Sequence, residues 1–81
     1  MDWHGVIVCD PKILVGKPTV KGTRISVELI LAHLALGESA QEIVADFPQL
    51  KESDIRAALA FAAEHIGGAF RAPVHEATAG A

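Results

Sequence analysis

Cationic side chains near the start of this chain are the residues whose types and spacing suggest chemistry. Lys17, Lys21 and Arg24 lie in the stretch GKPTVKGTRISVELI, just before an apolar run. A phosphate-binding loop of the Walker type needs Gly, four residues and then Gly-Lys-Ser/Thr. Here five residues separate Gly16 from Gly22, and threonine follows where lysine is required. The stretch therefore predicts a turn that feeds a helix, with its cations facing solvent or a partner, and not a nucleotide site.

The distribution of charge also points to this N-terminal part. The net charge is −3, but residues 1–27 hold four cations and two acids, a net of +2, whereas residues 28–81 hold three cations and eight acids, a net of −5. Attraction to phosphates depends on local cationic clusters. We therefore expect any polyanion to approach the N-terminal part.

Neither catalysis nor metal binding is predicted. The histidines His4, His33, His65 and His75 show no spacing typical of a metal site, and no nucleophile stands beside a base. The single Cys9 cannot form an internal disulfide, in agreement with a reducing cytoplasm. We therefore expect a protein that is not an enzyme and has no cofactor.

Length and hydropathy limit the class of protein further. No apolar run reaches ten residues, whereas a membrane helix needs ~20, and the N-terminus MDWHGVIVCD lacks the basic region of a secretory signal. We expect a cytoplasmic protein without a membrane span. A single domain of 81 residues buries only about 60% of its unfolded surface, and this small core favours a homodimer.

Short strands are predicted before residue 26. Residues 6–9 are β-branched and precede the turn signal Asp10-Pro11, so we expect one strand there and a second at residues 12–15. Two further β arms, residues 19–20 and 23–25, are expected around a turn at Gly22. Such a ribbon needs support from helices or from a second copy.

Three helices are predicted after the ribbon. Ser26 can cap the first, which ends at Gly37 and buries one face. Ser39 and Glu42 form a capping box for the second, which Pro48 ends. Ser53 is expected to cap the third, which ends at the Gly67-Gly68 pair. The face of the third helix expected to be buried comprises Ile55, Ala58, Leu59, Ala62 and Ile66.

The predicted fold is mainly α (α+β), with a short N-terminal β hairpin before a three-helix, helix-turn-helix domain of the winged-helix or homeodomain type. Its parts are residues 1–26, the helical core 27–66 and a flexible tail 67–81. Lys51 and Arg56 are the cations near the start of the third helix. Two acids, Asp54 and Glu64, are expected on its outer face, where they would repel DNA phosphates and weaken binding. A trihelical core without a DNA role therefore remains an alternative.

The third helix also predicts a contact surface. Phe61 lies about 60 to 100° away from the expected buried face, beside Ala57 and Ala60. These side chains would form a small exposed apolar patch, which often marks an interface. The alternative is that the first helix or the hairpin covers Phe61.

A combination of short motifs resembles the domain of unknown function 433 family, small prokaryotic helix-turn-helix proteins classed as VapB-like antitoxins. The similarity covers residues 6–66. The motifs are Asp10-Pro11, Gly16-Lys17-Pro18, Gly22-Thr23-Arg24-Ile25, Asp46-Phe47-Pro48 and the run from Asp54 to Leu59. The resemblance implies an antitoxin that binds and silences a PIN-like ribonuclease toxin and represses its own operon.

Residue roles follow from this implied function. PIN-like nucleases hold a metal with clustered carboxylates, which an arginine can oppose. We therefore expect the toxin to contact Phe61 and the tail residues Phe70 and Arg71. Operator DNA or a second copy is expected to contact the cations Lys17, Lys21, Arg24, Lys51 and Arg56. An interaction domain that forms homo-oligomers without binding nucleic acid is the alternative.

Overall fold

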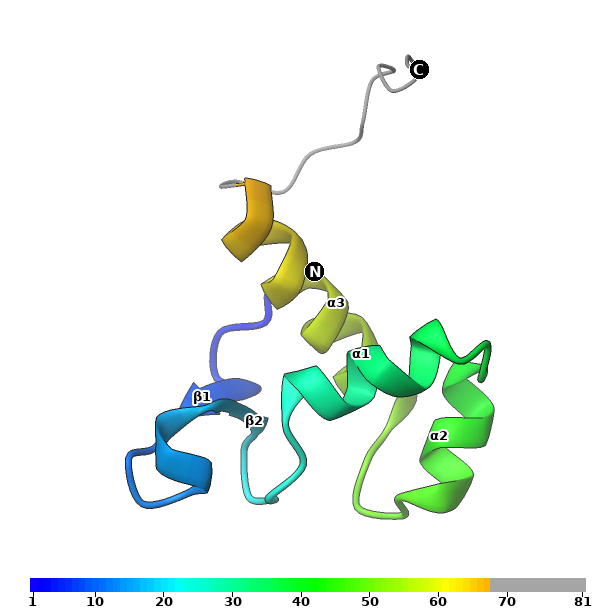
Figure 1. Cartoon of the computed structure of the whole chain (residues 1–81), viewed down its shortest axis with the longest axis horizontal. Helices are drawn as coiled ribbons and strands as arrows, with labels where there is room; N and C mark the ends of the chain where they lie inside the picture. The colour runs from blue at the N-terminus through cyan, green and yellow to red at the C-terminus, as the bar shows by residue number, and fades with distance from the viewer. Residues whose placement is uncertain (68–81) are drawn as a thin grey trace.

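The computed structural model describes residues 1–67 of the chain. A two-stranded antiparallel sheet pairs Ile7 with Val20 and Cys9 with Pro18. Figure 1 shows α1 and α2 on one side of α3 and the sheet on the other, with the last turns of α3 extending beyond both. The predicted α+β fold, a hairpin followed by three helices, is confirmed. Its elements are β1 (Ile7–Cys9), β2 (Pro18–Val20), α1 (Val27–Ala35), α2 (Ala40–Asp46) and α3 (Glu52–Gly67).

The hairpin differs from the prediction in its second strand. A strand at residues 12–15 was expected, but Leu14–Gly16 form a 3-10 turn. The chain already folds back at Asp10, whose side chain accepts a hydrogen bond from the Lys12 amide at 2.9 Å, and an aspartate turn of this kind competes with an extended strand. The expected arm at residues 23–25 is also not a strand. The turn itself is present, because Gly22 has φ +82°.

The predicted ends of the first two helices are confirmed. The Ser26 hydroxyl accepts from the Leu29 amide at 2.9 Å, and Gly37, with φ +94°, is the C′ residue after α1, as predicted. The Ser39 and Glu42 side chains each accept from the other residue's backbone amide, which forms the expected capping box. These caps satisfy amides and carbonyls that a helix leaves without partners.

The start of α3 differs from the prediction. The expected cap was Ser53, but the helix begins at Glu52, and the Asp54 carboxylate accepts from the Lys51 amide at 2.9 Å. The Asp54 side chain thereby folds back over the start of α3, and the residue is only 7% exposed. The prediction that Asp54 lies on the outer face of the helix is therefore wrong. Ala57, also expected to face outward, is fully buried.

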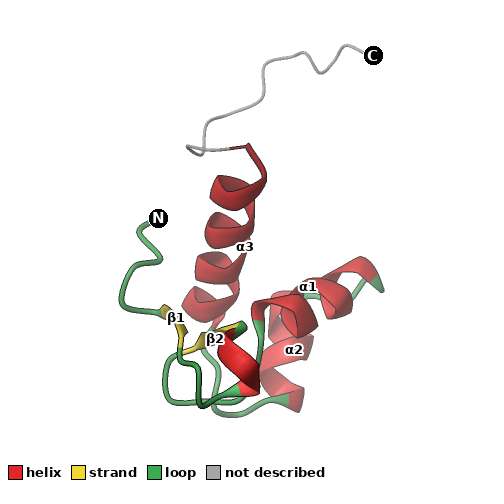
Figure 2. Ribbon diagram, turned by 60° about the vertical axis from the view of Figure 1, so that its left-hand side comes forward, coloured by secondary structure: helices red, strands yellow, loops and turns green. Residues whose placement is uncertain are grey.

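One hydrophobic core joins the sheet, α1, α2 and α3. Ile55 and Ala58 are buried in it as predicted, whereas Leu59 is 45% exposed and Ile66 is 87% exposed. The face of α3 that was expected to be buried is therefore covered only in part, because the last turns of the helix extend beyond its neighbours (Figure 2). The buried apolar residues are Ile7, Val20, Ile25, Val27, Ile30, Ile43, Leu50, Ile55, Ala57 and Ala58.

The 3-10 turn predicts a stabilising substitution. Leu14 and Val15 have φ of 50° and 58°, the left-handed region that a β-branched residue rarely adopts. Val15 is 95% exposed, so its side chain contributes almost no packing. We expect Val15→Gly to raise the free energy of unfolding by about 0.5 to 1 kcal/mol, because relief of strain exceeds the added entropy of glycine in the unfolded chain. Urea denaturation followed by circular dichroism measures this change.

Val15→Thr is the matched control for that substitution. Threonine keeps the branched side chain and the strain, so we expect no stabilisation. A loss of stability in Val15→Gly would contradict the left-handed geometry of this turn.

Candidate functional site

An apolar groove of about 320 Å³ lies between α1 and the C-terminal half of α3. Val27 and Leu31 form one wall because residues four apart share a face of a helix. Phe61, Ala62 and Ile66 of α3 form the opposite wall. Pro18 at the start of β2 also lines the groove, and the polar members of the lining are Glu28 and His65. The groove is thus an apolar surface with a polar margin.

Phe61 is part of the groove and not of a free patch. Its ring meets the indole of Trp3 edge-on at 4.8 Å and stacks on the His65 imidazole at 4.0 Å. One side of its ring is thus covered by Trp3, which precedes both the hairpin and the first helix that the alternative named, and Phe61 also lines the groove. Residue spacing within α3 could not indicate Trp3, which is 58 positions away in the sequence.

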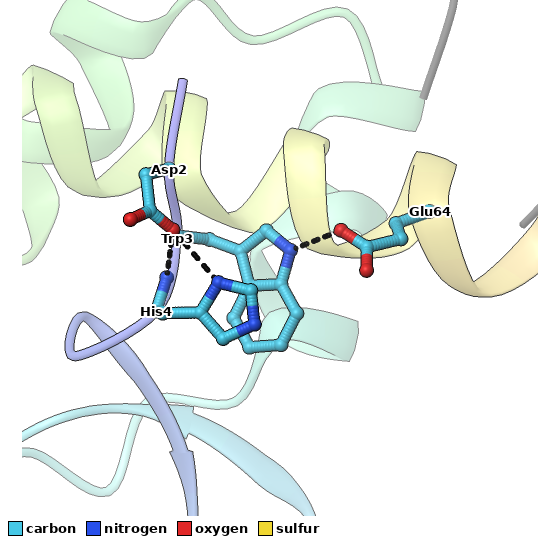
Figure 3. A network of polar contacts seen from close by, with 4 residues as sticks. All are labelled: Asp2, Trp3, His4 and Glu64. Atoms are coloured by element: carbon cyan, nitrogen blue, oxygen red, sulfur yellow. Dashed lines mark hydrogen bonds and ion pairs between the residues drawn. The ribbon is translucent and has the colours of Figure 1, made fainter. Parts of the chain in front are cut away.

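The N-terminal residues are held against α3 by a polar and aromatic network (Figure 3). The Trp3 indole donates to the Glu64 carboxylate at 2.8 Å, and the His4 imidazole stacks on the indole at 3.9 Å. Asp2 lies 2.7 Å from His4 Nδ1 and accepts from the His4 amide at 3.0 Å. The side-chain hydrogen bond to His4 lowers the pKa of the Asp2 carboxyl. This network fixes Trp3 and, through it, the position of Phe61.

Lys17 lies at the margin of the groove and is paired. Its ammonium is 2.9 Å from the Glu28 carboxylate, and both side chains are exposed. The hydrogen bond from Lys17 lowers the pKa of the Glu28 carboxyl. An exposed ion pair of this kind contributes little stability. Lys17, which we had assigned to DNA, is therefore engaged with α1.

The other predicted DNA contacts divide into two groups. Lys21 and Arg24 are exposed in the turn after β2, and Lys51 is exposed in the connection between α2 and α3. These two segments lie at the same end of the molecule in both views (Figures 1 and 2). Arg56 instead lines a hollow on α3 with Met1 and residues of that helix. The structure thus brings three of the five cations to one end.

Comparison with known proteins identifies the family. A family model described as a protein of unknown function (DUF433) matches residues 7–62. The chain belongs to the DUF433 family. It is also similar to a DUF433 member protein from Anabaena variabilis ATCC 29413, whose crystal structure was determined at 2.00 Å resolution. The two chains share 25% sequence identity, and their superposition has a TM-score of 0.69. The similarity covers 79% of this chain and 61% of that protein, and no curated protein matches.

The part matched to DUF433 contains most of the groove. Its α1 wall and residues 61–62 of the α3 wall lie within it, whereas His65 and Ile66 lie outside. The groove is therefore formed mainly by the family domain, and the last turn of α3 completes it.

The first turns of α3 in this DUF433 chain do not present the side chains of a typical DNA-reading helix. Ile55, like Asp54, is buried, and the exposed positions are Glu52, Arg56 and Leu59. Only Arg56 among them can donate two hydrogen bonds to guanine, and Glu52 would face phosphates unfavourably. This face of α3 is better suited to contact with protein.

Two features are absent from the part of the chain that the structure describes. Within residues 1–67 there is no group of three or more His, Cys, Asp or Glu side chains that could hold a metal ion. In the same range no helix is long and apolar enough to cross a membrane. The predicted toxin contacts Phe70 and Arg71 lie outside the described residues.

Proposed function

We propose that this DUF433 chain is a non-catalytic binding module, an antitoxin-like regulator of a type II toxin–antitoxin system in the cytoplasm. The observation that carries the proposal is the groove between α1 and α3. An apolar groove of about 320 Å³ with a polar margin suits the apolar face of a partner's helix. That the partner is a PIN-like ribonuclease is supported by the motif resemblance to VapB-like antitoxins.

The groove and the tail would contribute different contacts to this complex. Phe61 and Leu31 offer apolar surface within the groove. Arg71 follows α3 closely in the sequence, and its planar guanidinium pairs well with carboxylates such as those around a nuclease metal. The tail residues would thus block the nuclease site while the groove supplies the docking surface.

Binding to operator DNA is a second candidate function. It is supported by the position of Lys21, Arg24 and Lys51 at one end of the molecule, in turns and not on a helix face. Contacts from such turns would go mainly to phosphates, so the affinity would fall steeply with salt and depend little on sequence. An autorepressor needs this surface in addition to the groove.

The proposal predicts a complex with the product of the adjacent reading frame. The two chains should co-purify without ribonuclease activity, and the separated partner should cleave RNA. Ala62→Arg places a long cation in the groove and should release the partner, since Ala62 lines the groove. Ala45→Arg, at an exposed position of α2, is the matched control and should retain it.

Other outcomes of this experiment favour the alternatives. A chain that forms no complex but binds upstream DNA in a salt-dependent way would favour a repressor. A chain that does neither would favour an interaction domain without nucleic-acid binding.

A further inference from the structure

The last turns of α3 carry a second apolar face, which meets the groove wall at Ile66. Arg56, Leu59, Ala63 and Ile66 follow one another at spacings of three, four and three residues, the pattern of a coiled-coil seam. Leu59 is 45% exposed and Ile66 is 87% exposed. A helix that is apolar on more than one face is typical of a buried position. The exposure of these side chains therefore indicates a surface that another chain covers.

This face contains both a hollow and a protruding side chain. A hollow of about 190 Å³ is lined by Arg56, Leu59, Ala60 and Met1. The three α3 residues of this lining and Ala63 have the spacing i, i+3, i+4, i+7. Four residues at this spacing form the hole that receives a knob in a coiled coil. Ile66 lies one heptad after Leu59 and is the matching knob.

We infer that two copies of this chain pair through antiparallel α3 helices, with each Ile66 seated in the hollow of the other copy. A twofold axis between Ala62 and Ala63 places position 66 of one helix opposite position 59 of its partner. One contact is then made twice, as an isologous dimer requires. The alanines at and beside the axis allow the two helices to approach closely.

Charge favours the antiparallel direction. The C-terminus of a helix carries partial negative charge on its last carbonyls, and a cation beside it is stabilising. In the antiparallel pair, the exposed Arg56 lies beside the C-terminal end of the partner's α3. In a parallel pair the two Arg56 side chains would face each other and repel. Shape and charge thus agree on a second copy in this orientation.

The dimer face shares Ile66 with the groove wall but does not include Phe61. Phe61 and Ala63 are two positions apart, so their side chains point about 200° away from each other around α3. Ile66 and Ala62 belong to both surfaces, so sedimentation of this chain alone, without a toxin, tests the dimer separately from the proposed toxin binding.

Sedimentation equilibrium of the full chain tests the dimer. We expect a dimer at tens of micromolar, and Ile66→Asp should raise its dissociation constant by about 30-fold or more, as for an interface hot spot. Leu36→Asp is the matched control, because Leu36 is also exposed, at 78%, but lies after α1. It should leave the dimer intact, and circular dichroism shows whether each variant is folded. A monomeric wild type, or a folded Ile66→Asp chain that dimerises normally, would overturn the inference.

Disulfide cross-linking tests the orientation, in a Cys9→Ser background. Chains with Leu59→Cys and Ile66→Cys should cross-link when mixed, because these positions face each other. Ile66→Cys alone should not, since its two copies lie about 10 Å apart along the axis and a disulfide needs Cα atoms within ~7 Å. Efficient cross-linking of Ile66→Cys to itself would overturn the antiparallel pairing.

Discussion

Ile43→Ala should lower the free energy of unfolding by about 3 kcal/mol, within the 2 to 5 kcal/mol typical of large-to-small core substitutions. Ile43 is the residue through which α2 enters the core, and its side chain is completely buried. Truncation loses apolar burial and leaves a cavity that a short helix cannot easily close. Domains of this size are stabilised by roughly 5 to 15 kcal/mol in total, so the loss is a large fraction. Urea denaturation followed by circular dichroism measures it.

Leu36→Ala is the control for this substitution. Leu36 is 78% exposed, so its truncation should change the free energy of unfolding by no more than about 0.5 kcal/mol. If Ile43→Ala cost no more than Leu36→Ala, the placement of α2 on the core would be wrong.

Asp54→Ala should lower the free energy of unfolding by about 1 to 2 kcal/mol. The substitution removes the acceptor of the Lys51 amide and a negative charge from the positive end of α3. Asp54→Asn keeps an acceptor oxygen and should retain part of this stability. Thermal unfolding of the variants under identical conditions measures the difference.

Ser53→Ala separates the observed cap of α3 from the one that the sequence predicts. Asp54, and not Ser53, accepts the hydrogen bond at this terminus, so Ser53→Ala should change the free energy of unfolding by no more than about 0.5 kcal/mol. A cost equal to that of Asp54→Ala would show that the serine caps the helix.

Local signals account for the parts of the fold that the sequence predicts. The caps at Ser26 and Ser39 and the C′ glycine that follows α1, Gly37, each depend on residues within a few positions. The error at residues 12–15 arose where two local preferences compete, because the turn at Asp10 overrides the strand propensity of its apolar neighbours. The correct partner of β1 depends on pairing between distant residues, which no short pattern specifies.

The candidate site was predictable only in part for the same reason. Phe61 could be singled out by its place on the helix, but its contact with Trp3 joins distant parts of the chain. Val27 and Leu31 have the spacing of a core face and gave no sign that they also form a groove wall. The exposure of Leu59 and Ile66 follows from where the neighbouring elements end, which helical periodicity does not specify.

The central claim is that the groove between α1 and α3 binds a partner protein. Its most direct test is to add the unlabelled product of the adjacent reading frame to the ¹⁵N-labelled full chain and to map the amide chemical-shift changes. We expect the largest changes at groove residues such as Leu31, Phe61 and Ala62, with little change at Lys21 and Arg24. Changes confined to those cations and Lys51, or no changes at all, would contradict the claim.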